Sequence, residues 1–506
     1  MIEELKREII SNDNSNVAYS EKGAKMNSST GKNLLDLSFK VPSMRTWPDS
    51  RINKSSDAAY RENRELFVRF MFYLRDVLGG IGERDTFRRM FVWFSKENPA
   101  AAEKLLRYLP AYGRWDDLVH VALNTKSAGV AAEAARVIAG QIKTDLESDN
   151  VSLLGKWLPS VNAGKKSAAD ARKLVSLINK TYKCSMNAAY YRKAVSKLRA
   201  KAGIVEHHIA AKTYGDINYE AVPSLANTRY SKLFLKYDEK RRREYLESVS
   251  KGEKKINSSA AFPHDIWRKV SVNDNTADEM WKALPNFITN DSRVLVVRDG
   301  SGSMLSRIPN SVATAMDVAS SLCVYFAERL TGEFHNKFIT FSSYPDLVEL
   351  PEGTLYQKKR FLNRYDDCSN TDIEATFQLI LDTAVKNQMK QEDLPDTLLI
   401  VSDMEFDSAT YGDRSKKLFN NISERWSDAG YKMPKLVFWN VNSRTETIPM
   451  TQNENGVILV SGFSAAICKT VLSNETDPYK ALVKALMNAR YDGPAECVKE
   501  QLRQTV

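Results

Sequence analysis

The sequence has few of the residues that build disulfides or zinc sites. Its 506 residues include five cysteines and five histidines. The cysteines are odd in number, scattered and without a C-x-x-C pair, which argues against a disulfide framework or a zinc site and favours a reducing compartment. The histidines are dispersed as well, so no metal site of nitrogen and sulfur ligands is expected.

Long apolar runs and nucleotide-binding motifs are also missing. No apolar stretch approaches the ~18 residues of a membrane-spanning helix, and the first residues, MIEELKREIISNDNS, lack the apolar core of a signal peptide. We therefore expect a cytoplasmic protein without a membrane partner. The chain has no G-x-x-x-x-G-K-[ST] loop, no H-E-x-x-H and no H-x-E with P-C-x-x-C, so we expect no nucleotide cofactor and no catalytic activity.

A localised positive charge is what the sequence does have. Hydrophobic residues make up 43% and charged residues 27% of the chain, which is ordinary for globular proteins, and the length suits two or three domains. The net charge is +10, but residues 151–260 contain 23 Lys and Arg against 9 Asp and Glu, a net charge of +14. A basic excess confined to one segment indicates a polyanion-binding surface.

The first half of the chain has the periodicity of helices. Residues 1–57 are polar, and we expect a partly ordered N-terminal segment there. Apolar residues then recur at i, i+3 and i+4, as in Phe67, Phe70 and Met71. Glycine and proline breaks separate such runs, and strand-like alternation is missing. This pattern predicts a HEAT-like α-solenoid over residues 58–285, without a fixed repeat period.

The positive charge lies on this helical half. Its cations recur at roughly helical spacing and are interleaved with tyrosines such as Tyr182, Tyr190 and Tyr214. Cations that neutralise phosphates and aromatic rings that stack on bases are typical of single-stranded RNA binding. A solvated helix face with half-buried tyrosines is the plainer alternative. The candidate RNA-binding residues are Lys165, Lys166, Arg192, Lys193, Lys197, Arg199, Arg241, Arg242 and Arg243.

Residues 290–490 alternate between predicted strands and helices, which indicates a doubly wound parallel sheet. The first strand contains Val294–Val297 and is apolar throughout, as a strand buried on both faces must be. The other predicted strands are 337–341, 347–350, 397–402, 435–441 and 457–460, with 347–350 on an antiparallel edge.

The first strand leads directly into Asp299-Gly300-Ser301-Gly302-Ser303. In an open α/β sheet, ligands bind beyond the carboxyl ends of the strands. The spacing D-x-S-x-S supplies one carboxylate and two hydroxyls, which are ligands for a hard cation such as Mg²⁺ (or Mn²⁺), and the glycines let the backbone turn around the ion. The alternative is that the two serines cap a helix and Asp299 closes a turn.

This motif resembles the metal-ion-dependent adhesion site (MIDAS) of von Willebrand factor type A domains. The resemblance implies two further oxygen donors from later loops, and Thr371 and Asp403 stand in the matching places. The implied metal ligands are therefore Asp299, Ser301, Ser303, Thr371 and Asp403. A domains of this type bind an acidic side chain of a protein partner through the ion, so we expect such a partner here.

One residue departs from that pattern. Arg298 directly precedes Asp299, where A domains usually carry an apolar residue. A guanidinium beside the ion loop could lower the metal affinity, or it could pair with Asp372.

The pairing of the two halves resembles the Ro autoantigen (TROVE) family, and more closely an uncharacterised bacterial, phage and plant family of Ro-like proteins. In Ro proteins the helical repeats close into a ring, which binds small structured RNAs outside and single-stranded RNA ends in its hole. The resemblance therefore implies a non-catalytic RNA-binding scaffold of a ribonucleoprotein. The segments that carry it are Gly79–Arg84, Lys156–Ser160, Tyr191–Lys193, Val222–Ser224, Lys254–Asn257, Pro263–Ile266, Ser402–Met404 and Ser461–Phe463.

Two other functions fit the same residues. The acidic loops around Asp299, Asp403, Glu405 and Asp407 would suit a metal-dependent nuclease, although no general base stands out. A protein-only adaptor would instead use the basic helices to bind acidic protein surfaces. If the protein binds RNA, its affinity should fall steeply as the salt concentration rises. An affinity that does not depend on salt would favour the adaptor.

Overall fold

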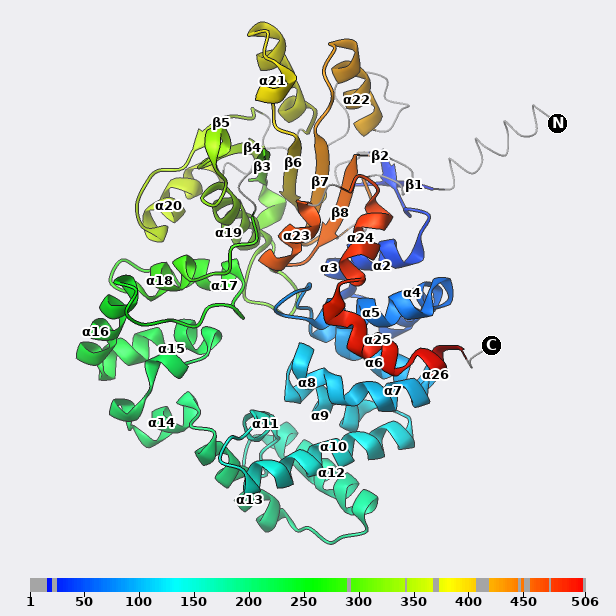
Figure 1. Ribbon diagram of the computed structural model, residues 1–506, viewed down its shortest axis with the longest axis vertical. Helices are drawn as coiled ribbons and strands as arrows, with labels where there is room; N and C mark the ends of the chain where they lie inside the picture. The colour runs from blue at the N-terminus through cyan, green and yellow to red at the C-terminus, as the bar shows by residue number, and fades with distance from the viewer. Residues whose placement is uncertain are drawn as a thin grey trace, which may run out of the picture. The chain divides into compact units, whose positions relative to one another are not determined.

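The computed structural model describes residues 16–20, 25–288, 293–341, 344–366, 373–405, 418–444, 447–449, 456–472 and 475–503. By its internal contacts the chain divides into two compact units, and each is discontinuous (Figure 1). The sheet unit consists of Met1–Trp47 and Ser258–Ala485, and the helical unit of Pro48–Asn257 and Leu486–Val506. These units divide the chain at other residues than the domains predicted from the sequence, 1–57, 58–285 and 290–490.

In the described part of the sheet unit, one large sheet has the strand order β5-β4-β3-β6-β7-β8 (Figure 1). Neighbouring strands pair in parallel except β4 and β5, which are antiparallel, so the predicted antiparallel edge is confirmed. Renumbered from β3, this is the order 3-2-1-4-5-6, with a topological switch point between β3 and β6. The bounds are β3 Val294–Asp299, β4 Lys337–Phe341, β5 Leu347–Glu349, β6 Thr397–Ser402, β7 Lys435–Asn440 and β8 Val457–Ser461.

The central strands are buried on both faces, as their apolar sequences predict. Every residue of β3 and β6 is buried. Helix α19 (Ala315–Ala327) packs on β3, and all of its residues except Asp317 are buried. The later helices of this unit are α20 Leu355–Leu362, α21 Ile373–Lys386, α22 Leu418–Asp428, α23 Cys468–Val471 and α24 Pro478–Leu486.

The predicted α-solenoid extends to residue 285, yet residues 262–288 contain two helices of the sheet unit. Helix α17 (Pro263–Trp267) packs against α19, and α18 (Thr276–Lys282) packs against α17. The indole N–H of Trp281 donates to Glu328 Oε2 at 2.6 Å, just beyond the end of α19. The buried tryptophans of both helices explain why this segment belongs with the sheet.

The N-terminal segment is also part of the sheet unit. Strands β1 (Val17–Tyr19) and β2 (Lys25–Asn27) pair antiparallel, and helices α2 (Asn33–Phe39) and α3 (Val41–Met44) follow. Helix α2 packs against β8. Ser461 Oγ donates to the Ser38 carbonyl at 2.6 Å, and Asn440 Nδ2 donates to the Phe39 carbonyl at 3.0 Å. Because Asn440 and Ser461 end β7 and β8, α2 covers the carboxyl ends of these two strands.

The helical unit has no strand among its described residues. Its core is rich in aromatic rings, such as Phe67, whose centroid lies 5.5 Å from that of Tyr60 and 5.7 Å from that of Trp93. The assignment of these helices to HEAT-like repeats stays a prediction. The helices are α4 Asp49–Glu62, α5 Arg64–Arg75, α6 Asp85–Glu97, α7 Pro99–Leu105, α8 Leu109–Tyr112, α9 Trp115–Asn124, α10 Ala128–Glu147, α11 Leu154–Trp157, α12 Lys165–Tyr182, α13 Ala188–Lys201, α14 Val205–Ala211, α15 Ser224–Tyr237, α16 Glu239–Ser250, α25 Asp492–Cys497 and α26 Lys499–Arg503.

The last residues of the chain complete the helical unit. Helix α25 packs against α5, and the buried carboxylate of Asp76 pairs with Arg490 and accepts from the Tyr491 hydroxyl at 3.1 Å. Buried charges are tolerated when they are paired in this way. Within the described residues, no helix of either unit is both long and apolar enough to span a bilayer.

Candidate metal centre and nucleic-acid interface

The loop after β3 holds its carboxylate in a fixed position. Asp299 is fully buried at the carboxyl end of β3. Its Oδ1 accepts from the Ser301 backbone N–H at 2.9 Å, and its Oδ2 accepts from Ser402 Oγ at 2.6 Å. Since Ser402 ends the neighbouring strand β6, the two strand ends that face each other across the switch point are joined at this carboxylate.

The two serines of the motif bond to each other. Ser301 Oγ and Ser303 Oγ lie 2.9 Å apart. Ser301 stands at the N-cap of a single 3₁₀ turn, Gly302–Leu305, and in the part of the chain that the structure describes its side chain makes no capping hydrogen bond. Thr314, not a motif serine, caps α19, accepting from the Asp317 N–H at 3.1 Å. The helix-cap interpretation of the serines is therefore wrong.

Asp403 reaches the same place from β6. It directly follows Ser402 and is fully buried. Burial, and next the negative charges of Asp299 and Glu405, raise the pKa of Asp403 to about 7, although a hydrogen bond with Ser303 opposes the shift. Among the described residues, its Oδ2 has no hydrogen-bond partner, and the Arg444 guanidinium lies 3.9 Å away. A buried carboxylate oxygen is thus left for a ligand.

The sequence analysis named Glu405 only for the nuclease alternative, yet its negative charge acts on the Asp403 carboxylate. It is fully buried, and its Oε1 accepts from the Arg444 backbone N–H at 3.0 Å. The alternation of acidic residues after β6 was the signal that could have placed it there. Met404, between the two acids, has φ +66°, a left-handed conformation that costs energy for a side chain of this size.

Four of the five implied metal ligands are described, and they meet. Asp299, Ser301 and Ser303 share one loop, and Asp403 interacts with Asp299 by charge and with Ser303 by a hydrogen bond. Thr371 lies outside the described residues, as do Asp372 and Asp407. No three His, Cys, Asp or Glu side chains of the described residues form a metal-binding group by themselves, so this candidate site depends on the serine hydroxyls.

Arg298 lies beside this loop, but its guanidinium is engaged with other residues. It is buried, its Nε donates to Ser320 Oγ of α19 at 3.0 Å, and its guanidinium pairs with Asp366. Asp366 is thus a described partner of Arg298, whereas Asp372, suggested from the sequence, lies outside the described residues.

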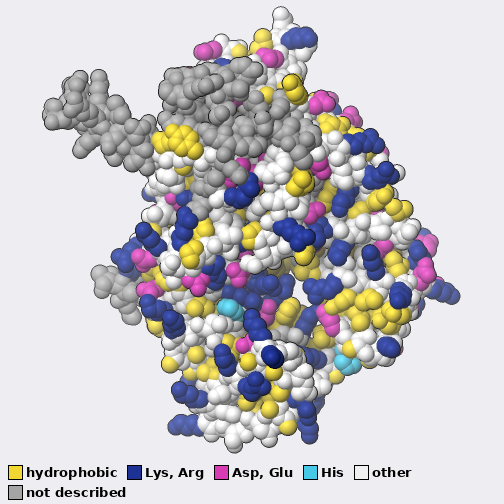
Figure 2. Space-filling model, turned by 180° about the vertical axis from the view of Figure 1, so that it is seen from behind, with side chains coloured by type: hydrophobic (Ala, Val, Ile, Leu, Met, Phe, Trp, Pro, Cys, Tyr) yellow, Lys and Arg dark blue, Asp and Glu magenta, His cyan; other side chains and the backbone are white. Residues whose placement is uncertain are grey.

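The basic candidates on α12 and α13 are mostly exposed. Lys165 and Lys166 begin α12, and Arg192, Lys193 and Lys197 lie on α13, all with exposed side chains. In the lower part of Figure 2, dark blue Lys and Arg side chains are more prominent than magenta Asp and Glu. These five cations form what we call the α12–α13 basic surface.

Arg199 and Arg241 are engaged with backbone carbonyls. Arg199 donates to the carbonyls of Gly155 at 2.9 Å and Leu158 at 2.8 Å. Arg241 donates to the Ile217 carbonyl at 2.7 Å. Both guanidinium groups fasten neighbouring segments to their helices, so they are poor candidates for binding phosphate.

Arg242 is a wrong prediction. It is fully buried, with its guanidinium carbon 4.9 Å from the ring centroid of Tyr219 and 5.3 Å from that of Tyr245. Three consecutive arginines on a helix point in three directions about 100° apart, so one of them faces the core. Arg243 is exposed and pairs with Glu239 at 2.9 Å.

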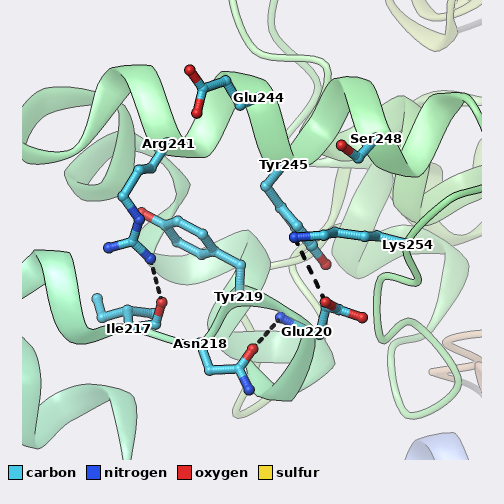
Figure 3. A pocket seen from close by; sticks show the side chains of 9 residues that line it. All are labelled: Ile217, Asn218, Tyr219, Glu220, Arg241, Glu244, Tyr245, Ser248 and Lys254. Carbon is cyan, nitrogen blue, oxygen red and sulfur yellow. Dashed lines mark hydrogen bonds and ion pairs between the residues drawn. The ribbon is translucent and has the colours of Figure 1, made fainter.

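Arg241 also borders a polar pocket (Figure 3). Its volume is about 340 Å³, and the stacked rings of Tyr219 and Tyr245 lie along it with Arg241 and Lys254. Glu220 lies 3.8 Å from the Lys254 ammonium. Charges of both signs line the space, so the pocket does not favour an anion. The full lining is Ile217, Asn218, Tyr219, Glu220, Arg241, Glu244, Tyr245, Ser248 and Lys254.

Exposed aromatic rings accompany the cations. Tyr182 and Tyr190 are 50% and 59% exposed, which suits stacking on bases. Tyr237 was not predicted from the sequence; it is 53% exposed, stacks on Tyr214 with 4.8 Å between ring centroids, and lies under the Lys236 ammonium.

Comparisons with known proteins cover both halves of the chain. Residues 293–501 match the model of a family described as a domain of unknown function (DUF7788), and residues 124–290 match that of another (DUF2828). A relative from Acanthamoeba polyphaga mimivirus, "Uncharacterized protein L728", is 24% identical in an alignment of 515 residues that covers 93% of this chain and 87% of that one.

Among solved structures, the chain is similar to the Ro (RSR) protein of Deinococcus radiodurans. The sequence identity is 15% and the TM-score 0.41, over 83% of this chain and 93% of that one. The sequence analysis predicted a likeness to Ro proteins, and this solved structure is that of a Ro protein.

Proposed function

We propose that the chain is a non-catalytic scaffold that binds a divalent cation in its sheet unit and RNA on its helical unit. The observation that carries the metal site is the buried Oδ2 of Asp403, which has no hydrogen-bond partner among the described residues. Leaving such a group unsatisfied costs about 1–3 kcal/mol or more. The negative charges of Asp299 and Glu405 act on the same carboxylate, and a cation would offset all three.

The donor atoms select the type of ion. Asp299, Ser301, Ser303 and Asp403 offer oxygen alone, and Thr371 is proposed as a fifth oxygen donor. Oxygen ligands without nitrogen or sulfur suit Mg²⁺ or Mn²⁺. The hydrogen bonds from the Ser301 N–H and Ser402 Oγ orient the Asp299 carboxylate, as partners of ligating carboxylates do.

A bound Mg²⁺ would keep one coordination position open for an acidic side chain of a protein partner. The strand order, and a carboxylate at the end of each strand that flanks the switch point, support a von Willebrand factor type A domain for the sheet unit. We propose HEAT-like repeats for the helical unit because its apolar residues recur at i, i+3 and i+4 between glycine and proline breaks.

The RNA site of the proposal is the α12–α13 basic surface, Lys165, Lys166, Arg192, Lys193 and Lys197. Their side chains are exposed, unlike that of Arg242, and the exposed rings of Tyr182 and Tyr190 lie on the same two helices. Phosphate neutralisation by such cations makes affinity salt-dependent, and exposed rings add stacking on unpaired bases.

A Mn²⁺ titration followed by electron paramagnetic resonance tests the metal site. Wild type should bind one Mn²⁺ per chain, and Asp299→Ala should lose it. Asp382→Asn, which changes an exposed carboxylate on α21, is the matched control and should bind as wild type does. Unchanged binding by Asp299→Ala would remove the proposed site.

RNA binding is tested by charge reversal on α13. A variant with Arg192, Lys193 and Lys197 changed to Glu should lose affinity for a single-stranded RNA in filter binding. A control with the same charge change at the exposed Lys54, Arg61 and Lys96 should keep most of it. Equal affinities of the two variants for RNA would contradict the proposed RNA site and favour the protein-only adaptor. RNA cleavage by wild type but not by Asp299→Ala would show that the protein is a nuclease.

A further inference from the structure

Arg298 is a charged residue inside a strand that is buried on both faces. Side chains alternate along a strand, so Arg298 and Asp299 point to opposite faces of the sheet. Only 1% of Arg298 is exposed. Its Nε donates to Ser320 Oγ at 3.0 Å, and its Nη2 lies 2.9 Å from the Met316 sulfur, both on α19. These contacts anchor the Arg298 guanidinium to α19.

The other contacts of Arg298 hold a segment that is distant in sequence. Residues Asn363–Tyr365 form a short 3₁₀ turn that ends at Asp366. The Arg298 guanidinium pairs with the Asp366 carboxylate, and its Nη1 donates to the Tyr365 carbonyl at 3.4 Å. One guanidinium thus binds a side chain and a backbone carbonyl of the same turn.

That carbonyl also touches the metal loop. A Cβ on Gly300 would lie 2.6 Å from the Tyr365 oxygen, a distance that real Cβ atoms do not adopt. The backbone of the loop is therefore in close contact with the turn that Arg298 holds. The Tyr365 ring packs against Phe338 of β4, with 6.2 Å between centroids, so the turn is fixed on its other side as well.

We propose that Arg298 is a positioning residue for the metal site. Through Asp366 and the Tyr365 carbonyl it keeps the turn against Gly300, and this contact keeps the Ser301 and Ser303 hydroxyls in place to bind the ion. The inference rests on the proposed metal site. It gives Arg298, which stands where A domains usually carry an apolar residue, a role in metal binding.

A charge effect predicts the opposite outcome. If the guanidinium acted only through its positive charge, it would repel the cation. Arg298→Met would then bind metal more tightly, and Arg298→Lys, which keeps the charge, would bind as wild type does. Positioning predicts weaker binding by both variants, because a lysine ammonium cannot reproduce the planar fork that reaches Ser320, Tyr365 and Asp366 together.

Mn²⁺ titrations of the full chain distinguish these cases. We expect Arg298→Lys and Arg298→Met each to weaken Mn²⁺ binding by roughly 10- to 100-fold, the usual effect of losing a partner that supports metal ligands. Asp366→Asn removes the same ion pair at a partly exposed position, 21% for the Asp366 side chain, and should also weaken binding. Arg329→Lys changes another largely buried arginine of the sheet unit, whose guanidinium lies over the Tyr325 ring, and should bind as wild type does.

Hydrogen exchange in EDTA gives a readout without metal. The backbone N–H groups of Ser301 and Met304 donate within the loop, and they should exchange faster in Arg298→Lys than in wild type or Arg329→Lys. Wild-type affinity and unchanged exchange in Arg298→Lys, or tighter binding by Arg298→Met, would overturn the positioning role. A wild type that binds no Mn²⁺ would instead remove the metal site itself.

Discussion

Replacing Asp403 by Asn should stabilise the metal-free protein relative to wild type, and the variant should gain much less stability from Mg²⁺ than wild type does. The pKa of Asp403 is raised from 3.8 to about 7. Between about pH 4 and pH 7, Asp403 keeps its proton in the native state but loses it in the unfolded state. The native state therefore becomes less stable as the pH rises through this range, and the loss of stability persists at higher pH. At 1.36 kcal/mol per unit, the charged carboxylate costs the metal-free protein about 4 kcal/mol at pH 8.

Asn keeps the shape of the side chain and removes the charge. In EDTA at pH 8, Asp403→Asn should therefore raise the thermal midpoint of the sheet unit, by roughly 10 °C if 1 kcal/mol corresponds to about 2–4 °C. This difference in thermal midpoint should shrink as the pH falls toward 4, because Asp403 of native wild type is then protonated and uncharged. Calorimetry of the full chain measures both effects.

Mg²⁺ should offset most of this difference in stability. At 100 times the dissociation constant a ligand stabilises the native state by about 2.7 kcal/mol, and wild type should gain this while Asp403→Asn gains much less. Asp382→Asn is the control and should follow wild type in both buffers. The reasoning is refuted if Asp403→Asn is less stable than wild type in EDTA at pH 8, or if both proteins gain equally from Mg²⁺.

Three further predictions concern the fold. Burial lowers the pKa of His264 below its ordinary value, so the unfolded state gains a proton that the native state refuses as the pH falls below about 6.5; this costs wild type stability, and the thermal midpoint of His264→Phe should therefore rise relative to that of wild type between pH 7.5 and 5.5. Leu35→Ala on α2 removes a fully buried side chain and should lower the free energy of unfolding by about 2–5 kcal/mol in urea titrations, whereas an unchanged value would mean that α2 does not contribute to the sheet unit. Arg242→Glu places a carboxylate among the Tyr219 and Tyr245 rings and should unfold the helical unit, which would reduce the helical signal in circular dichroism. Arg243→Glu, at an exposed position, should leave the spectrum unchanged.

The sheet and the centre of its site were readable from the sequence because their signals are local. Four apolar residues in a row, Val294–Val297, are typical of a strand buried on both faces, and the same holds for Leu398–Val401. The resemblance to a metal-ion-dependent adhesion site implied that Asp299 and Asp403 meet, and each of them stands at the end of an assigned strand. The structure brings them together through Ser402 and Ser303.

The roles of individual arginines could not be predicted, because they depend on distant segments. Arg242 faces the core because the Tyr219 ring, 23 positions earlier, meets it there. Arg199 looks like its exposed neighbour Lys197, but the carbonyls it binds belong to Gly155 within α11 and to Leu158 directly after that helix. The partner of Arg298 lies 68 residues away. Such pairings follow from tertiary packing, which spacing along the chain does not encode.

The N-terminal segment shows the same limit. Residues 1–57 are polar enough to suggest partial order, yet α2 carries Leu34 and Leu35 into a fully buried position beside β8. The hydrogen bonds that fix it, from Asn440 and Ser461, come from residues about 400 positions later in the chain. Sequence proximity could not have indicated them.

Anomalous diffraction from crystals grown with Mn²⁺ tests the central claim most directly. The account predicts one peak at about 2.0–2.3 Å from carboxylate or hydroxyl oxygens of Asp299, Ser301 and Ser303, with Asp403 bound directly or through a water molecule. Fully loaded crystals with no peak at the Asp299 loop, or with the manganese bound at another site, would contradict it.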